Sequence, residues 1–296
     1  MKNTTPSATA LFVANGMYFN SNRRRLRKDV SENYRSYYVQ LIEHVYSIRS
    51  VFKRRFHLLK CSLSQRFTID GFYLHFLLRK KCIEREVHSA IKNGYEQILI
   101  LGAGYDLLGV SLSDKYPDVK FIEVDHPATS SVKQQLFKEL NWAHPNRIEL
   151  SFDLNESDVL FSSEHINKNS KTLIICEAVL MYLPPKTVDQ ILETIWKNFK
   201  RCKFVFTFMN EKEPGDYMFR DAHPMTSNYL RMNSEPFSWG MSVLGVEDFL
   251  EQRGWKLLDI FDDHRLRNDF LSAYNRNLPL AIGEHVVCCE PISNGK

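Results

Sequence analysis

The chain has 296 residues, of which 44% are hydrophobic, so it can bury a substantial core and intrinsic disorder is excluded as its default state. The net charge of +4 is mild, but residues 1–60 contain 12 Lys and Arg against 3 Asp and Glu. This excess predicts a basic arm or cap that would attract an anionic substrate, a nucleic acid or an acidic membrane surface, with a solvated basic face as the alternative.

The first part of the chain is predicted to be helical. Ser7 or Thr9 can cap the first helix through its side-chain oxygen. A second helix is predicted over residues 32–49, where apolar side chains recur at helical spacing. A third is predicted over residues 68–92, with Gly94 at its C-terminal end.

Short apolar runs then alternate with amphipathic stretches. The runs cover residues 97–101, 120–124, 147–151, 172–176, 203–208, 256–261 and 284–289. This alternation predicts an α/β fold: a Rossmann-like, doubly wound, mostly parallel seven-stranded sheet with an N-terminal helical cap. The last two runs suit an antiparallel pair, because no clear crossover helix joins them. We expect residues 1–94 to form the cap and residues 95–296 the core of one integrated domain.

The cysteines argue against a metal site and against a disulfide framework. The six of them show no C-x-x-C pair and no zinc-type spacing with histidine, so we expect reduced thiols and no metal. No stretch approaches the roughly 18 consecutive apolar residues of a membrane span, and the N-terminal apolar segment has the wrong polarity for a secretory signal. We therefore expect a cytoplasmic protein without a membrane span; its oligomeric state is not predicted.

The sharpest local motif is ILILGAGYD, residues 98–106, in which an apolar strand runs into a glycine turn that opens a helix. Ligands of such open sheets bind at the carboxyl ends of the strands. Gly102 and Gly104, with Ala103 between them, let the backbone turn tightly and approach a ligand closely. A dinucleotide fingerprint would place a third glycine at Leu107, so a nicotinamide oxidoreductase is the least favoured interpretation.

The ends of the next strands carry further candidates. Asp125 lies 21 residues after Gly104 and can accept hydrogen bonds from two ribose hydroxyls. Glu123 shares its strand face and is the alternative ribose partner, and a solvent-exposed turn carboxylate is the alternative without a function. After the third strand, Asp153 could bind an adenine amino group and Leu154 could cover the ring, although an Asp after a strand is more often a helix cap.

The end of the fourth strand adds two candidates. Glu177 can offset the cationic groups of a ligand, or it can be tied to neighbouring backbone amides. Tyr182 can pack at the mouth of an active site, where we assign it as the catalytic candidate, or it can belong to the core.

Four motifs, LGAGYD, FIEVDHP, SFDL and CEAVLMYLPP, in this order and spacing resemble the leucine carboxyl methyltransferase family. The resemblance covers residues 66 to about 259 and implies S-adenosylmethionine as the cofactor and S-adenosylhomocysteine as the product. It implies these contacts: Gly102, Ala103 and Gly104 with the methionine and ribose portions, Asp125 with the ribose, Asp153 and Leu154 with the adenine, and Glu177 with the amino-acid end. Arg66 falls where the family places an arginine that clamps the cofactor carboxylate, for which a guanidinium fork is suited; the alternative is an ordinary surface arginine in a basic segment.

The leading hypothesis for the acceptor is a carboxylate of a small molecule or a peptide. Besides the resemblance, the reason is that a carboxylate is ionised at neutral pH and needs no general base. His126 and His223 stay candidates as bases for a hydroxyl or amine acceptor. Two further hypotheses are a tRNA acceptor, suggested by the basic N-terminus, and a non-catalytic protein that binds an adenosyl ligand. The basic residues of segment 23–28 could orient an anionic acceptor if the N-terminal segment folds over the pocket as a lid, and a binding arm is the alternative.

Overall fold

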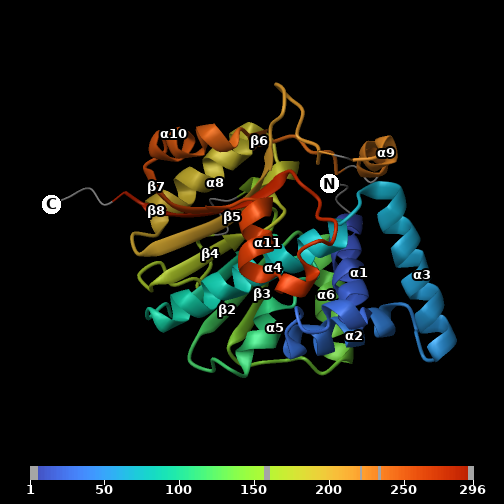
Figure 1. The fold of residues 1–296 in the computed structure, drawn as a ribbon. Coiled ribbons are helices and arrows are strands. Elements are labelled where there is room, and N and C mark those ends of the chain that lie inside the picture. The colour runs from blue at the N-terminus through green and yellow to red at the C-terminus, as the bar shows by residue number, and fades with distance from the viewer. Residues whose placement is uncertain (1–5, 157–160, 221, 233–234, 293–296) are drawn as a thin grey trace.

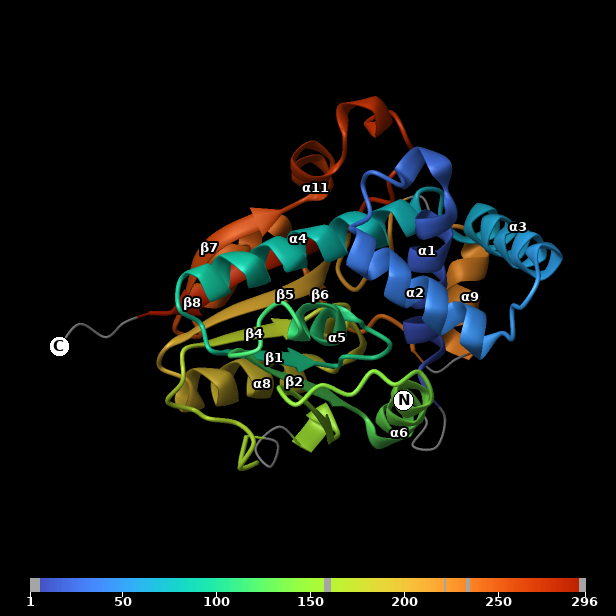
Figure 2. The ribbon, with the colours of Figure 1, turned by 90° about the horizontal axis from the view of Figure 1, so that it is seen from below.

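The computed structural model describes residues 6–156, 161–220, 222–232 and 235–292. In these residues a central sheet carries helices on both faces (Figure 1, Figure 2). The strands follow the order β3-β2-β1-β4-β5-β8-β7, and β6 pairs with β5. Their bounds are β1 Gln97–Leu101, β2 Lys120–Asp125, β3 Arg147–Ser151, β4 Thr172–Cys176, β5 Cys202–Asn210, β6 Gly240–Met241, β7 Trp255–Phe261 and β8 Glu284–Pro291.

The helices form an N-terminal group and a group that alternates with the strands. The N-terminal group comprises α1 Ala8–Asn22, η1 Arg24–Leu26, α2 Glu32–Val45, α3 Val51–Thr68 and α4 Phe72–Lys92. The second group comprises α5 Leu108–Ser113, α6 Pro127–Glu139, η2 Leu154–Glu156, η3 Leu180–Tyr182, α8 Pro185–Asn198, α9 Pro224–Met232, η4 Val243–Gly245, α10 Val246–Glu251, α11 Asp263–Phe270 and η5 Ala273–Asn275. Here η denotes a 3₁₀ helix.

The sheet confirms the predicted α/β architecture. Strands β1 to β5 pair in parallel, and β8 runs antiparallel between β5 and β7, as expected for the last two runs. All seven predicted strands are present, and β1, β3 and β4 begin and end at the predicted residues. The structure adds β6, which the sequence pattern missed because two residues show no periodicity. Since β2 lies on one side of β1 and β4 on the other, the strand order reverses at β1.

Successive side chains of the central strands enter two different cores. On β1, Ile98 and Ile100 join the core that contains α1, α2 and α4, whereas Leu99 and Leu101 join the core that contains α8 and α10. Figure 2 shows α4 on one side of the sheet and α8 on the other. Both faces are buried because each is covered by helices, which explains why these strands are continuous apolar runs. Helix α4 shares a core with β1 across residue 94. The predicted division into a cap, residues 1–94, and a core, residues 95–296, therefore stays a prediction.

The N-terminal helices agree with the predictions only in part. The Ser7 side chain accepts a hydrogen bond from the Ala10 amide, which makes Ser7 the cap of α1. The second helix ends at Val45, earlier than expected. The third begins at Phe72, because Gly71 adopts a left-handed conformation (φ +76) and separates it from α3. Helix α3 was not predicted as a separate helix.

Helix α1 packs closely on α4, because Gly16 has no side chain at the contact. A Cβ atom added to Gly16 would lie 2.6 Å from Cδ1 of Tyr73 and 2.8 Å from Cδ2 of Phe76. Both rings are buried in the core, so they have little room to move. This glycine therefore sets how near the N-terminal helix can approach the rest of the fold.

We predict that Gly16→Val lowers the free energy of unfolding by about 1–3 kcal/mol, because the added atoms overpack this contact. Urea denaturation measures the change. The control is Gly245→Ala, where an added Cβ would have no atom within 4 Å and φ is −93°; it should change the free energy by less than about 0.5 kcal/mol. Equal effects of the two substitutions would contradict the close α1–α4 contact.

Candidate cofactor and active site

A cavity of about 540 Å³ lies at the carboxyl ends of β1, β2 and β4, and α1 contributes to its wall. Ligand pockets of proteins typically measure about 300–1,000 Å³. The predicted site residues that line it are Gly102, Ala103, Gly104, Asp125, Asp153, Leu154, Glu177 and Tyr182. The structure thus brings together every residue assigned to the cofactor contacts or to catalysis except Arg66, whereas the alternative candidates Glu123 and His223 do not line the cavity.

The glycine turn forms the floor next to β1. Gly102 and Gly104 both have positive φ angles, +68° and +47°, which residues with a side chain rarely adopt. The amide of Ala103 donates to the carbonyl of Val124 at 2.9 Å, and the amide of Gly104 donates to the Asp125 carboxylate. The turn is therefore joined directly to the acid at the end of the neighbouring strand.

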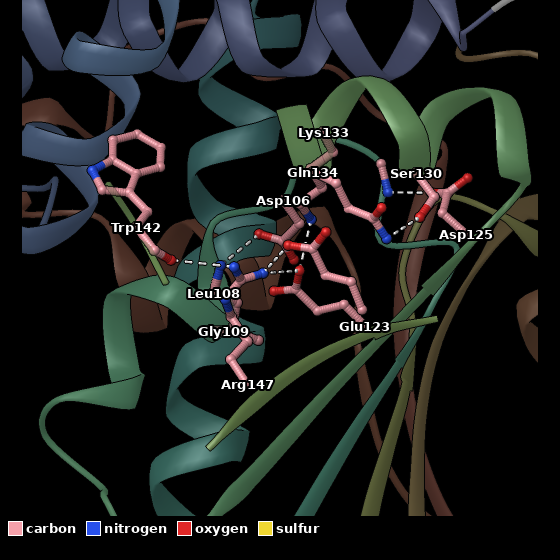
Figure 3. A network of polar contacts seen from close by, with 12 residues as sticks. Asp106, Leu108, Gly109, Glu123, Asp125, Ser130, Lys133, Gln134, Trp142 and Arg147 are labelled. Atoms are coloured by element: carbon pink, nitrogen blue, oxygen red, sulfur yellow. Dashed lines mark hydrogen bonds and ion pairs between the residues drawn. The ribbon is translucent and has the colours of Figure 1, made fainter. Parts of the chain in front are cut away.

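Asp125, not Glu123, faces the cavity. Its carboxylate also accepts a hydrogen bond from the His126 amide at 2.6 Å, and burial raises the pKa of Asp125 despite these bonds. Glu123 lies 2.9 Å from Nζ of Lys133 and 3.2 Å from Nη1 of Arg147, and it does not line the cavity. Figure 3 shows Glu123 facing these two cations, with Asp125 farther along the strand. Of the two acids, Asp125 is therefore the one that a ligand in the cavity can reach.

Asp153 and Leu154 follow β3 and line the side of the cavity next to Asp125. The Asp153 carboxylate accepts hydrogen bonds from the amide and the side chain of Asn155 at 3.0 and 2.8 Å. These bonds occupy one of its two oxygens, so Asp153 can stabilise the turn and still bind a ligand with its other oxygen. Leu154 is buried and presents an apolar surface to the cavity.

A buried ionic cluster surrounds Glu177. Its two carboxylate oxygens lie 2.7 Å from Nε of Arg79 and 2.8 Å from Nζ of Lys80. Lys80 also lies 3.0 Å from the Asp106 carboxylate, and Arg79 contacts Glu284 on β8. All of these residues except Glu284 line the cavity. The cluster therefore connects α4 to the ends of β1, β4 and β8 through charged hydrogen bonds.

The arginine of the cavity is Arg79 and not Arg66. Arg66 is exposed on α3 and does not line the cavity, whereas Arg79 is buried on α4 with its guanidinium at the ionic cluster. The motif RFTIDGFYLHFLLRK contains both arginines, and the clamp role of Arg66 stays a prediction that the position of Arg66 outside the cavity wall does not support. Arg79 was passed over because it lies among apolar residues that are typical of a helix core.

The basic segment 23–28 does not form a lid over the cavity. None of its residues lines the cavity, and Arg25 instead donates to the side chain of Asn275 at 2.8 Å. The wall is completed by the first turns of α1, through Thr9, Ala10 and Val13. Helix α1 therefore lines the cavity with its first turns, and the basic segment that follows this helix lies outside the cavity wall.

One part of the cavity wall contains none of the predicted cofactor contacts. It is lined by Glu235, Thr9 and Tyr182. The Glu235 carboxylate is 5% exposed and accepts hydrogen bonds from the amide of Thr9, at 3.2 Å, and from its hydroxyl. Burial and Glu235 raise the pKa of Tyr182, so its phenol is neutral near pH 7. Its ring packs against Phe237 with ring centroids 5.3 Å apart. Tyr182 can donate a hydrogen bond there but is a poor base.

The two histidine candidates differ in position. His126 lines the cavity, and its Nδ1 accepts a hydrogen bond from the Ala128 amide at 3.3 Å, which caps α6. His223 is exposed and does not line the cavity. Within the described residues, no group of three or more His, Cys, Asp and Glu side chains could hold a metal ion. All six cysteines are free and buried, and burial raises the pKa of the Cys61 thiol to about 11.

A family model described as leucine carboxyl methyltransferase matches residues 43–196, just over half of the chain. The chain belongs to the leucine carboxyl methyltransferase family. S-adenosylmethionine is therefore its cofactor, as the sequence motifs implied. The matched residues extend from α2 to α8 and include most of the cavity wall.

Known proteins similar to this family member match it over part of their length. "Putative S-adenosyl-L-methionine-dependent methyltransferase" from Mycolicibacterium vanbaalenii is 25% identical over 200 residues, which are 64% of this chain and 62% of that protein. "Leucine carboxyl methyltransferase 1" from Eremothecium gossypii is 21% identical over 151 residues, 43% of this chain and 46% of that protein. A DUF574 family protein from Streptomyces avermitilis shares the fold, with a TM-score of 0.56, 12% identity, and coverage of 74% of this chain and 84% of that one.

Several residues of this site were not predicted from the sequence. Arg79, Lys80 and Asp106 carry charges at the cavity wall, and Thr9 and Glu235 approach it from distant parts of the chain. Asp106 directly follows the glycine turn, so its place in the motif was a usable signal. Glu235 had no such signal, because only the tertiary structure brings it next to Thr9.

We predict that Glu284 stabilises the fold above about pH 4.5 and that this contribution is lost as the pH falls toward 2. Burial alone would raise the pKa of Glu284, but Arg79 and His75 lower it to about 2 from an ordinary value of 4.5. Because the folded protein binds this proton more weakly than the unfolded chain, acid removes the stabilisation. Glu284→Gln should therefore be less stable at pH 7, by roughly 3–5 kcal/mol for a broken buried pair, and lose less stability on acidification.

Denaturation measured from pH 7 to pH 2 tests this prediction. The control is Glu290→Gln, which removes an exposed partner 3.8 Å from Lys256 and should leave the acid dependence unchanged. Parallel acid profiles of the wild type and Glu284→Gln would contradict the assigned role of this carboxylate.

Proposed function

We propose that this protein is a methyltransferase that uses S-adenosylmethionine as the methyl donor. The observation that carries the proposal is the cavity in which the glycine turn and Asp125 lie side by side at the ends of β1 and β2. Its wall contains five carboxyl groups, from Asp106, Asp125, Asp153, Glu177 and Glu235, and two cations, Arg79 and Lys80. A sulfonium cofactor of net positive charge suits this wall, whereas the phosphates of a nicotinamide dinucleotide would be repelled.

The donor groups of the wall fit the parts of this cofactor. Asp125 would hold the ribose hydroxyls, and Asp153 with Leu154 would hold the adenine. For the amino-acid end, Glu177 can accept from the ammonium group and Arg79 can donate to the carboxylate. This assignment replaces Arg66 by an arginine that already lines the cavity. Each contact pairs a charged or hydrogen-bonding group with a partner of the opposite kind.

The residues around the cavity position the reactants and exclude water. When bound, the cofactor supplies an electrophilic methyl group on a sulfonium. Ala10 closes over the glycine turn, where a Cβ atom added to Gly104 would lie 2.9 Å from the Ala10 Cβ. Correct orientation of two reactants can supply about 7–11 kcal/mol of the barrier reduction. Tyr182, as a neutral phenol, would orient an acceptor oxygen by hydrogen bonding rather than remove a proton from it.

The first acceptor class we propose is a carboxylate of a small molecule or a peptide, so that the product is a methyl ester. The support is the description of the family and the name of its Eremothecium relative, which concern carboxyl groups. An ionised carboxylate needs no base, and Tyr182 does not provide one. The Glu235 charge is partly offset, because it caps the start of α1 through Thr9.

A hydroxyl or amine acceptor is the second candidate, and Glu235 is the observation that favours it. This buried carboxylate faces the same part of the cavity as Tyr182 and could take the proton that such an acceptor releases. It would also repel an acceptor carboxylate at short range. A tRNA acceptor has less support, because the basic segment 23–28 lies outside the cavity wall.

We predict that Asp125→Asn weakens the binding of S-adenosylhomocysteine by about 1.5–3 kcal/mol, or roughly 10- to 150-fold, because charged hydrogen bonds to the ribose are lost. Isothermal titration calorimetry measures the affinity. The control is Asp189→Asn, a change at a carboxylate on α8 that is paired with Arg253 and is not part of the cavity wall; it should bind like the wild type. An unchanged affinity of Asp125→Asn would remove the ribose assignment.

We predict that Glu235→Gln retains methyl transfer to carboxylate acceptors, since no proton has to be removed. Radiolabelled cofactor and a panel of small carboxylates, phenols and amines test this, with base-labile label identifying an ester. If the acceptor is instead a phenol or an amine and the label is base-stable, Glu235→Gln should lower kcat by roughly 100-fold or more, as expected for loss of a general base. That outcome would overturn the carboxylate assignment and establish the second candidate.

A further inference from the structure

Helix α3 exposes a row of large apolar side chains. Half of the large apolar side chains that are exposed in the described residues lie on this one helix. Five of them recur every three or four residues and so share one face: Phe52, Phe56, Leu59, Leu63 and Phe67, which we call the α3 stripe. Phe52 is 83% exposed and Phe56 is 61% exposed. Soluble proteins rarely leave such a contiguous apolar surface without a function.

Cations border the α3 stripe on both sides. At about 100° per residue, Arg55 and Arg66 lie along one edge of the stripe, and Lys53 and Lys60 lie along the other. Between Val51 and Thr68 the sequence contains no Asp or Glu. The amphipathic pattern is therefore apolar in the middle and basic at its edges.

The opposite face of α3 is already used by the fold. Cys61 is buried, and the His57 ring lies 2.8 Å from the side-chain oxygen of Asn15 on α1. At the end of α3, the carbonyl of Thr68 accepts a hydrogen bond from the His223 amide at 2.9 Å. Figure 1 shows α3 beside α1 at the edge of the molecule, with α9 near its end. The α3 stripe thus points away from the body on a helix that is fixed in place.

We propose that α3 is an interfacial helix with which the protein docks on the surface of an anionic lipid bilayer. Helices that lie in the plane of a membrane place Phe and Leu side chains in the acyl boundary and Lys or Arg side chains at the headgroups. The side chains for the acyl boundary would be Phe52, Phe56 and Phe67, and the bordering cations would contact the headgroups. The basic excess of the N-terminal part thereby gains a partner of complementary charge.

This docking is peripheral. No helix of the described residues is long and apolar enough to cross a membrane. A second copy of the chain is a poorer occupant, because pairing two α3 stripes would bring their cations together without any acidic residue of α3 to offset them. A lipid surface offers both the apolar layer and the negative charge.

The position of α3 relates the docking surface to the cavity. Helix α3 packs against α1, whose Thr9 lines the cavity, and against α9, which precedes Glu235. A bilayer under α3 would thus lie near the two elements that flank the acceptor part of the site. Membrane binding itself does not depend on which acceptor is methylated, so the two proposals can fail separately.

Sedimentation with vesicles of equal parts phosphatidylcholine and phosphatidylserine tests the proposal on the full chain, with pure phosphatidylcholine vesicles in parallel. We expect binding to the anionic vesicles that weakens as salt is added. The double change Phe52→Ala and Phe56→Ala should reduce partitioning roughly tenfold or more, because two exposed rings no longer enter the bilayer. Each unit of positive charge that is removed should reduce partitioning at least about fivefold, and Lys60→Glu changes the charge by two units.

Two matched controls separate docking from general effects. Leu244→Ala removes an apolar side chain that is 94% exposed on η4, and Lys138→Glu reverses an exposed charge on α6; both should bind like the wild type. Absence of vesicle binding by the wild type would overturn the proposal. So would a concentration-dependent dimer in analytical ultracentrifugation that Phe52→Ala and Phe56→Ala abolish, because the α3 stripe would then be a contact between copies.

Discussion

The ion pairs of Arg79 and Lys80 are the interactions on which the cavity depends. From adjacent positions on α4 these cations contact Asp106, Glu177 and Glu284, which follow or begin three different strands. Buried ion pairs add little net stability, since desolvation offsets much of the attraction. They do fix distances, because a buried charge left without its partner is costly. The cluster therefore holds the ends of β1, β4 and β8 against α4 and gives the cavity its shape.

Local patterns predicted the sheet and the half of the site that lies on it. Continuous apolar runs identified the seven strands, and the glycine turn with Asp125 identified one part of the cavity wall, because each signal is contained in a few consecutive residues. Local patterns did not identify Arg79 and Glu235, for a physical reason. Their partners, Glu284 and Thr9, are distant in sequence, so only the folded chain shows that these buried charges are paired. Helix α3 was not predicted as a separate helix, because its apolar face is exposed and packs against no core.

The N-terminal helices do more than cover the sheet. Helix α1 begins at the cavity, where Ala10 meets the glycine turn, and packs on α4 through Gly16. Helix α3 packs on α1 and carries the cations and exposed rings that the proposed membrane docking uses. The basic charge of the N-terminal part is thus placed on the outer surface, while the cavity wall is rich in carboxyl groups. This separation suits a cationic cofactor inside and an anionic surface outside.

We propose that the glycine turn and Asp125 bind the adenosyl part of the cofactor, with Arg79 and Glu177 at its amino-acid end. A crystal structure with S-adenosylhomocysteine tests it most directly. We expect both ribose hydroxyls within hydrogen-bond distance of the Asp125 carboxylate, about 2.5–3.0 Å, and the sulfur turned toward Tyr182. A ligand whose ribose contacts other residues, or that lies outside the cavity, would contradict it.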